Sequence, residues 1–545
     1  MSSSASAASW VKPAALSQPT ASVLNLAPGF TPAQANAALK VLQTNHNEFH
    51  CFFNNNGFHN HTAHHILAAL SLGAPPDHYG RLWRHFLVND LDPSFELNHK
   101  PVQGDGSEPI TRDNWKQHLS VSKYYWSYLA FFEQELAENG VEATLERFIF
   151  SKDALSKPAL MLSRLVAGAV HPFIHLGYGL EFGMDGIVAE GLAMAAVTEA
   201  AYPKLLPEGW FDKVHRTSEE GSASLKTPAT AAQPRSGSSI FTVFARMGAD
   251  SSLAPGTANK WTDESKFAAT NRSSSITIAS HLDSWHTTPE DVAFATSAKD
   301  EHGWIPKVAE LVWINTLMMG ATSRPGHANV HDFFMMHSHN ATIFLPAYMR
   351  ALSSSAQSRA LVLHALARTT AFIWISCGRP EFFIREKLNV PESEEDADHF
   401  YHPDHQFPAN RTEREADKVE PASASSLNAA EHGDKKSHRA RPSAWYDILS
   451  SASIHFDEHL VKAIRTQAYF SSVLGGTPAG SLFLDDAELK NKEDERVFKG
   501  QLGELDGSAF LRTAAQMMDS QGWATGVERD MHWVRDPIGH DEAWK

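Results

Sequence analysis

Apolar residues recur at steps of three and four along several long blocks of the chain, which is the spacing of one face of an α-helix. This pattern predicts helices over residues 114–137, 143–166, 305–322 and 357–376. Alternation of apolar and polar positions, which is typical of a half-buried strand, is scarce, and residues 240–244 are the best short example. The sequence therefore predicts an all-α fold.

Two polar stretches, residues 213–239 and 392–442, are rich in Ser, Pro and charged residues. Such segments cannot bury enough apolar surface to fold alone, so we predict that both are flexible surface insertions. Residues 1–28 lack a positively charged start and an apolar core, and are predicted to be a disordered tail rather than a signal peptide. One large helical domain remains, with an N-terminal half, a central region and a C-terminal region at 29–212, 240–391 and 443–545.

The net charge and the absence of certain motifs make several classes of partner and cofactor poor candidates. The 545-residue chain has a net charge of −16, which repels phosphate groups and makes nucleic acid and anionic membranes poor partners. No run of about 18 apolar residues predicts a membrane span. Two cysteines cannot form a disulfide framework, so the reducing cytoplasm is the expected location. No Gly-rich phosphate loop, GxSxG or GxGxxG motif indicates a bound nucleotide or flavin.

The chain has 30 histidines, and imidazole is the side chain most used to bind metals and move protons near neutral pH. Asn60 can cap a helix on which His61 and His65 are four residues apart on one face, while His61 and His64 are three apart. Two imidazoles at this spacing can hold one metal ion. Histidines at a helix start, bonded to backbone or water, explain the pattern equally well.

A second pair, His171 and His175, lies in an apolar segment, where two buried imidazoles are costly unless each finds a partner. A shared metal ion supplies that partner, so metal binding is favoured here. Glu181 and Glu190 are candidate acceptors for the imidazole N–H groups, or ordinary carboxylates at a helix end. His337 lies in an equally apolar stretch and becomes a candidate ligand only in the company of the other two segments.

His455 and His459 repeat the four-residue spacing, and Lys462 follows about one turn beyond His459. A lysine near a metal loses its proton readily and can take up carbon dioxide to form a carbamate, an anionic oxygen ligand. A surface ion pair with Glu458 is the simpler explanation, and spacing alone favours it. Sites rich in imidazole and poor in thiolate suit Fe(II), zinc, copper or manganese, and four histidines with an open position suit oxygen activation.

Several blocks of the chain resemble the questin oxidase-like family, over nearly all of the sequence outside the two insertions. The matching blocks are NHTAHHILAALSLGAPP, NWKQHLSVSKYYWSYLAFFEQEL, GAVHPFIHLGYGLEF, SRPGHANVHDFFMMHSHNAT, CGRPEF, HFDEHLVKAIR and GHDEAW. HPFIHLGYGLEF and HFDEHLVKAIR are the most specific. The chain departs from the family pattern at HSHNAT, where a valine-like residue is expected in place of His339 and a threonine earlier than Thr342. This departure leaves the exact substrate open.

The resemblance implies an oxidoreductase of fungal secondary metabolism that acts on an aromatic polyketide. Such an enzyme is a non-haem iron mono- or dioxygenase that opens an anthraquinone or related polycyclic quinone by oxidative carbon–carbon cleavage, with a Baeyer–Villiger-like outcome. It implies Fe(II) as cofactor, dioxygen as co-substrate and NADPH as a candidate reductant. Carried onto this sequence, the implied metal ligands are His61 or His65, His171, His175 and His337, with Lys462 as a carboxylated lysine.

Other roles are less constrained by the sequence. Asp332 and Glu181 are candidate general bases. Aromatic residues at helical spacing are more often core than substrate contacts. The candidate walls for a stacked aromatic ring are Phe58, Tyr178, Phe182, Phe334 and Trp374. Two alternatives stay open: a zinc-dependent hydrolase or hydratase that uses the same histidines, and a non-catalytic helical scaffold. The sequence does not indicate the oligomeric state.

Overall fold

The computed structural model describes residues 31–99, 109–207, 209–211, 214, 237–263, 265–287, 292, 306–388, 444–482, 497–524 and 533–545. Within these residues the fold is mostly helical, which confirms the predicted all-α class. Two short strands, β1 (His331–Asp332) and β2 (Trp533–Val534), pair in parallel. The predicted tail and the insertion at 392–442 lie outside the described residues, as does most of the insertion at 213–239, so all three stay predictions.

The helices fall into three groups along the chain. The N-terminal group is α2 (Pro32–Glu48), α3 (Thr62–Ser71), α4 (Pro76–Asn89), η1 (Glu96–Asn98), η2 (Ser122–Tyr124), α5 (Tyr125–Leu145), η3 (Glu146–Phe150), α6 (Lys152–Leu155), α7 (Met161–Leu165), α8 (Ala167–Phe182) and α9 (Asp185–Val197). The central group is α11 (Ile240–Ala249), η4 (Ser251–Leu253), α12 (Lys266–Ser273), α13 (Ser275–Leu282), α14 (Pro306–Gly320), α15 (Phe333–Thr342), α16 (Leu345–Ala351), α17 (Ala356–Ser376) and α18 (Ile384–Leu388). The C-terminal group is α21 (Ala444–Ser453), α22 (Glu458–Leu474), η7 (Leu502–Glu504), α25 (Ala509–Gln521) and η8 (Asp541–Trp544).

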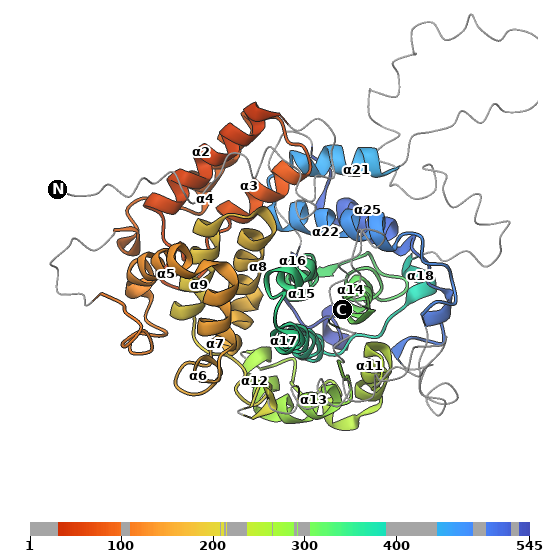
Figure 1. Cartoon of the computed structure of the whole chain (residues 1–545). Helices are drawn as coiled ribbons and strands as arrows, with labels where there is room; N and C mark the ends of the chain where they lie inside the picture. The colour runs from red at the N-terminus through yellow and green to blue at the C-terminus, as the bar shows by residue number, and fades with distance from the viewer. Residues whose placement is uncertain are drawn as a thin grey trace, which may run out of the picture.

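The three groups meet around α22. In Figure 1 the N-terminal helices occupy the left of the molecule and the central helices its lower right, with α21, α22 and α25 above the latter. Helix α22 packs against α3, α15 and α25, while α15 also packs against α8. One helix from each group, together with α8, therefore encloses a common interior space.

The sequence pattern located some helices well and others poorly. Those predicted at 305–322 and 357–376 are confirmed as α14 and α17. The helix predicted over 114–137 is wrong at its start, because it begins only at Tyr125. Residues 112–120 form turns, η2 follows them, and Ser120 has a left-handed φ of 69°.

Two other predicted elements are wrong. The block at 143–166 is divided among the end of α5, then η3, α6 and α7, with Pro158, which has no backbone N–H, between α6 and α7. The strand expected at 240–244 is the start of α11. The side chain of Ser239 accepts a hydrogen bond from the backbone N–H of Thr242, which is a helix N-cap.

Helices α8 and α9 approach each other closely through glycines. A Cβ at Gly191 of α9 would lie 2.6 Å from the backbone nitrogen of Leu176 on α8. A Cβ at Gly179 would lie 2.5 Å from the backbone nitrogen of Val188. Only glycine allows this contact, which sets the distance between the helix that carries His171 and His175 and the one that carries Glu190.

The substitution Gly191→Ala is expected to lower the free energy of unfolding by about 1–3 kcal/mol, because the added methyl group meets backbone atoms that cannot give way. Urea denaturation measures this loss. Gly80→Ala on α4 is the matched control, since its nearest neighbour is an arginine side chain at 3.9 Å, and it should be neutral or stabilising. Equal effects at the two positions would contradict the close packing.

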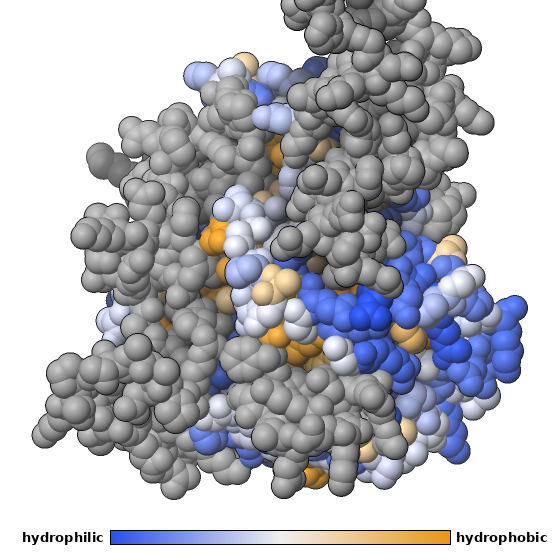
Figure 2. Space-filling model, turned by 90° about the vertical axis from the view of Figure 1, so that its right-hand side faces the viewer, coloured by the Kyte–Doolittle hydropathy of each residue, from blue (hydrophilic) through white to orange (hydrophobic). Residues whose placement is uncertain are grey.

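The apolar side chains lie mainly in the interior, and the largest fully buried ones include Trp285 and Trp374. On the face shown in Figure 2 the coloured surface is mostly hydrophilic, and apolar residues show as small separate areas. Among the described helices, none is both long enough and apolar enough to cross a bilayer.

Candidate metal centre

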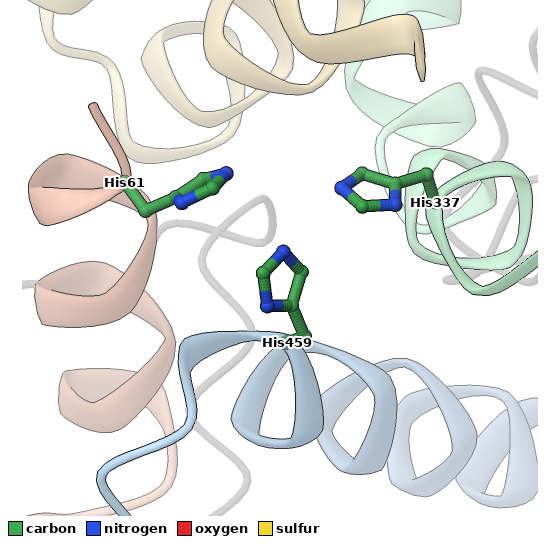
Figure 3. A group of neighbouring side chains, drawn as sticks. All are labelled: His61, His337 and His459. Atoms are coloured by element: carbon green, nitrogen blue, oxygen red, sulfur yellow. The ribbon is translucent and has the colours of Figure 1, made fainter. Parts of the chain in front are cut away.

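Four histidines from four parts of the chain meet in the space enclosed by α3, α8, α15 and α22. They are His61 at the N-cap of α3, His171 of α8, His337 of α15 and His459 in the first turn of α22. The Nε2 atoms of His61 and His171 are 2.8 Å apart. Ring nitrogens of His61, His337 and His459 all lie within 4.8 Å of one another. Figure 3 shows these three rings directed at a common point from three sides.

Backbone carbonyl groups orient two of the four rings. Nδ1 of His171 donates to the carbonyl oxygen of Gly168 at 2.5 Å, and Nδ1 of His337 donates to that of Phe333 at 2.7 Å. A neutral imidazole that donates from Nδ1 carries its lone pair on Nε2. Nε2 of His337 is buried and has no hydrogen-bond partner among the described residues. Both rings therefore present a free lone pair to the interior.

The carboxylate of Glu458 lies against the other two rings. Oε1 of Glu458 lies 3.0 Å from Nδ1 of His61 and 3.1 Å from Nδ1 of His459. Burial opposes ionisation of Glu458, but the neighbouring His459 and His61 hold its pKa well below the usual range. The ionised carboxylate favours a proton on both Nδ1 atoms, and Oδ1 of Asp457, 3.4 Å from Nδ1 of His459, acts in the same direction, so these rings also direct Nε2 inward.

The resulting donor set fits a transition metal ion. The Nε2 lone pairs of His61 and His171 face each other at 2.8 Å, which is repulsive unless a proton or a cation lies between them. Two nitrogen ligands at right angles, each about 2.1 Å from one metal ion, are about 3 Å apart. Buried nitrogens without partners also cost stability, and a shared cation would remove that cost.

Lys462 lies beside this cluster, one turn beyond His459. Its side chain is 2 % exposed, and Nζ has no partner among the described residues. Burial lowers the pKa of Lys462 to about 8, although the charges of Glu458 and Asp457 oppose the shift. The surface ion pair with Glu458 that spacing alone favours is therefore wrong. The amine is buried and available for chemistry.

His61 and His65 do not share a helix face as predicted, because His61 precedes α3 while His65 lies within it. Nε2 of His65 donates to the carbonyl oxygen of His455 at 3.0 Å, away from the cluster. Asn60 acts one residue before the N-cap, where its Oδ1 accepts from the backbone N–H of Thr62 at 3.0 Å. The choice between the two histidines thus favours His61.

His175 uses both ring nitrogens in other contacts. Nδ1 lies 3.1 Å from Nε2 of His64, and Nε2 lies 2.7 Å from Oε2 of Glu190. Glu190 is thus an acceptor for an imidazole N–H, as expected, whereas Glu181 forms a buried ion pair with Arg465. His175 stays a prediction as a ligand, and we leave it out of the set proposed below.

The two candidate general bases have partners of their own. Asp332 is the N-cap of α15 and accepts from the backbone N–H groups of Phe334 at 2.7 Å and Met335 at 2.8 Å. Its other oxygen lies 3.4 Å from Nζ of Lys266. Both Asp332 and Glu181 thus have structural contacts, and their role as general bases stays a prediction.

The structure does not gather the predicted aromatic walls around one space. Phe58 is 54 % exposed, and the ring contacts of Phe334 and Trp374 are with other phenylalanines. Tyr178 alone lies near the cluster, stacked on His64 with ring centroids 5.3 Å apart. Their role as substrate contacts stays a prediction.

Two members of the site escaped the sequence reasoning. His459 is not among the predicted ligands, because spacing alone favours a surface ion pair between Lys462 and Glu458 on this helix. Phe333 lies 4.6 Å from the ring of His337 and 5.1 Å from that of His459, between centroids. The one available signal was that Glu458, a potential acceptor, directly precedes His459 in the chain.

The substitution Glu458→Gln is expected to weaken metal binding about 10- to 100-fold, because an amide oxygen cannot replace a carboxylate that orients two imidazoles. Zinc titration against a chelating dye measures the affinity. Glu138→Gln is the matched control, since Glu138 is 51 % exposed and outside the cluster. Unchanged affinity in the Glu458 variant would contradict the orienting role.

A comparison with known families covers the residues of this cluster. A family model described as Questin oxidase-like matches residues 58–467, which include all four cluster histidines and Lys462. The chain belongs to the questin oxidase-like family. As a member of the questin oxidase-like family, it is an oxidoreductase.

Curated relatives are identical to this family member at about a quarter of the aligned positions. Baeyer-Villiger oxidase ptaJ of Pestalotiopsis fici is 26 % identical over 350 residues, which cover 64 % of this chain and 70 % of the relative. Oxidoreductase AflY of Aspergillus parasiticus is 27 % identical, covering 65 % and 67 %. The questin oxidase of Aspergillus fumigatus is 26 % identical, covering 66 % and 77 %.

Proposed function

We propose that the chain is an iron-dependent oxygenase that opens one ring of an anthraquinone or a related polycyclic aromatic polyketide by oxidative carbon–carbon cleavage in fungal secondary metabolism. The observation that carries this proposal is the convergence of four Nε2 lone pairs in a buried space without thiolate. Relatives named as questin oxidase and Baeyer–Villiger oxidases support oxygen chemistry on such a substrate.

The ligands in this proposal are His61, His171, His337 and His459. Imidazole nitrogens suit Fe(II), and Fe(II) held here would supply the electron transfer that activates dioxygen. The hydrogen bonds from Nδ1 to carbonyl oxygens, and the carboxylates close to the other two Nδ1 atoms, keep the four rings in the tautomer whose lone pair is on Nε2. Burial of the cluster keeps bulk water from the reacting atoms.

Lys462 has its own role in the proposal, as a carbamate. The neutral amine adds to carbon dioxide, a nitrogen–carbon bond forms and one proton leaves, which gives an anionic oxygen donor beside the four imidazoles. Burial favours the neutral amine that this addition needs. The carbamate would also replace a buried positive charge with a negative one that offsets the charge of the metal.

The aromatic substrate is proposed to lie against Phe333, because this ring contacts two of the four imidazoles. The guanidinium of Arg535 lies 4.6 Å from the centroid of Phe333, so a cation is at hand for a quinone carbonyl or a phenolate. NADPH stays a candidate reductant.

The test is an anaerobic reconstitution with Fe(II), followed by incubation with anthraquinones and their hydroquinones under ¹⁸O-labelled dioxygen, with and without NADPH. Mass spectrometry should find a ring-opened product that has gained one or two labelled oxygen atoms. The matched control is the same protein loaded with zinc, which should be inactive.

Two outcomes would overturn the proposal. Product formation by the zinc form, with oxygen from labelled water, would indicate the hydrolase or hydratase instead. Metal-independent product formation, or full competence after exhaustive chelation, would remove the metal from the function.

A further inference from the structure

A continuous series of hydrogen bonds runs from the protein surface to the histidine cluster. It begins at Glu133 of α5, whose side chain is 41 % exposed and whose Oε1 lies 3.0 Å from Nε2 of His46 on α2. Nδ1 of His46 lies 2.5 Å from Oε1 of Glu190, and Oε2 of Glu190 lies 2.7 Å from Nε2 of His175. Nδ1 of His175 then lies 3.1 Å from Nε2 of His64. Five side chains from five helices are thus joined by four hydrogen bonds.

The positions of the protons along this series follow from the acceptors. Burial opposes a charge on His46, but its hydrogen bonds to Glu133 and Glu190 raise its pKa to about 9, so it donates from both nitrogens at neutral pH. Glu190 is an ionised acceptor on both sides, which places the proton of His175 on Nε2. Nδ1 of His175 is then an acceptor for the Nε2–H group of His64.

The inner end of the series is an unpartnered ring nitrogen beside the cluster. Nδ1 of His64 is buried and has no hydrogen-bond partner among the described side chains and backbone groups. The ring of His64 lies 5.8 Å from that of His61 and 6.4 Å from that of His171, between centroids. His64 carries its proton on Nε2, where it donates to His175. Nδ1 of His64 therefore has a lone pair that can accept a proton.

We propose that Glu133, His46, Glu190, His175 and His64 form a proton path between solvent and the histidine cluster. A proton released in the cluster binds Nδ1 of His64, and His64 passes its Nε2 proton to Nδ1 of His175. His175 passes its Nε2 proton to Glu190, and His46 releases its Nε2 proton to Glu133 and solvent. Only N–H and O–H bonds are exchanged. The reverse steps carry one proton inward and restore the starting tautomers.

The purpose of this path rests on the proposed function. Oxygen chemistry in a site closed to water still has to exchange protons with solvent. A purely structural alternative is that the same bonds only orient His175 and His64. The two explanations differ in one respect. A purely structural role needs only the contact between Glu190 and His175, whereas a path also needs His46 to exchange its proton with solvent.

The experiment follows the exchange of imidazole N–H groups into D2O by ¹⁵N-resolved NMR on full-length, ¹⁵N-histidine-labelled protein, with and without zinc. Replacing the carboxylate by Glu190→Gln is expected to slow exchange at His64 by about tenfold or more. His46→Gln should slow it similarly. His50 is the internal control, because it is buried and donates from Nε2 to the carbonyl oxygen of Ser122, outside the series.

Slower exchange at His64 in both variants, with His50 unchanged, supports the path. Unchanged exchange at His64, or equal slowing at His50, overturns it. The wild-type protein gives a further test that needs no variant, since a proton on Nδ1 of His175 in place of Nε2 would break the series. None of these readouts depends on turnover. If no quinone is oxidised but the exchange results hold, only the proposed function fails.

Discussion

Alanine in place of His337 is expected to lower the affinity for Fe(II) by more than about 100-fold, with loss of oxygenase activity. The substitution removes one of four converging Nε2 donors from a buried space. Anaerobic titration and metal analysis of the purified protein measure the affinity and the iron content. The effect exceeds that of Glu458→Gln because a donor atom is lost and not merely misdirected.

His339→Ala is the matched control for this prediction. His339 is on the same helix and is equally buried, but the groups around it are Asn340 and His331 and not the cluster. Its replacement should change the metal affinity by less than about threefold. Equal losses in the two variants would mean that damage to α15, not the loss of a ligand, weakens metal binding.

The second large effect concerns stability. Glu181→Ala should lower the free energy of unfolding by about 3–5 kcal/mol, because it leaves the guanidinium of Arg465 buried without its counter-ion. Arg465 is 0 % exposed and also lies over the rings of Tyr178 and Phe182. Urea denaturation followed by circular dichroism measures the loss.

Two further variants separate the ion pair from other effects. The double substitution of Glu181 and Arg465 by methionine should recover much of the stability, because no unpaired charge remains. Asp153→Ala breaks an exposed ion pair with Lys116 and should cost no more than about 1 kcal/mol. A double variant as unstable as Glu181→Ala would show that the loss comes from packing and not from charge.

Helix periodicity predicted those parts of the fold that local patterns decide. Helix α17 was located because apolar residues line it from Ala356 to Ser376. The segment before Tyr125 was misassigned because its apolar residues have helical spacing, yet they pack as turns. The start of α11 was misassigned because a short apolar run does not distinguish strand from helix. Tertiary packing decided the conformation of the first segment, and the Ser239 N-cap decided that of the second.

The candidate site was predictable only in part, for a related reason. Apolar surroundings singled out His171 and His337, and the structure does bring them together, with ring centroids 4.6 Å apart. The four-residue spacing predicts that His61 and His65 share one helix face. His61 lies outside the helix, however, and only His61 belongs to the cluster. His459 was missed because nothing in the local sequence shows that α22 packs against α3 and α15.

The four imidazoles are distributed from residue 61 to residue 459, so the cluster cannot assemble until α22 has left the ribosome. A nascent or truncated chain that ends before Glu458 lacks both His459 and the carboxylate that orients His61. Such a product would have no complete ligand set for a redox-active metal. The proposed metal centre can therefore form only late in the synthesis of the chain.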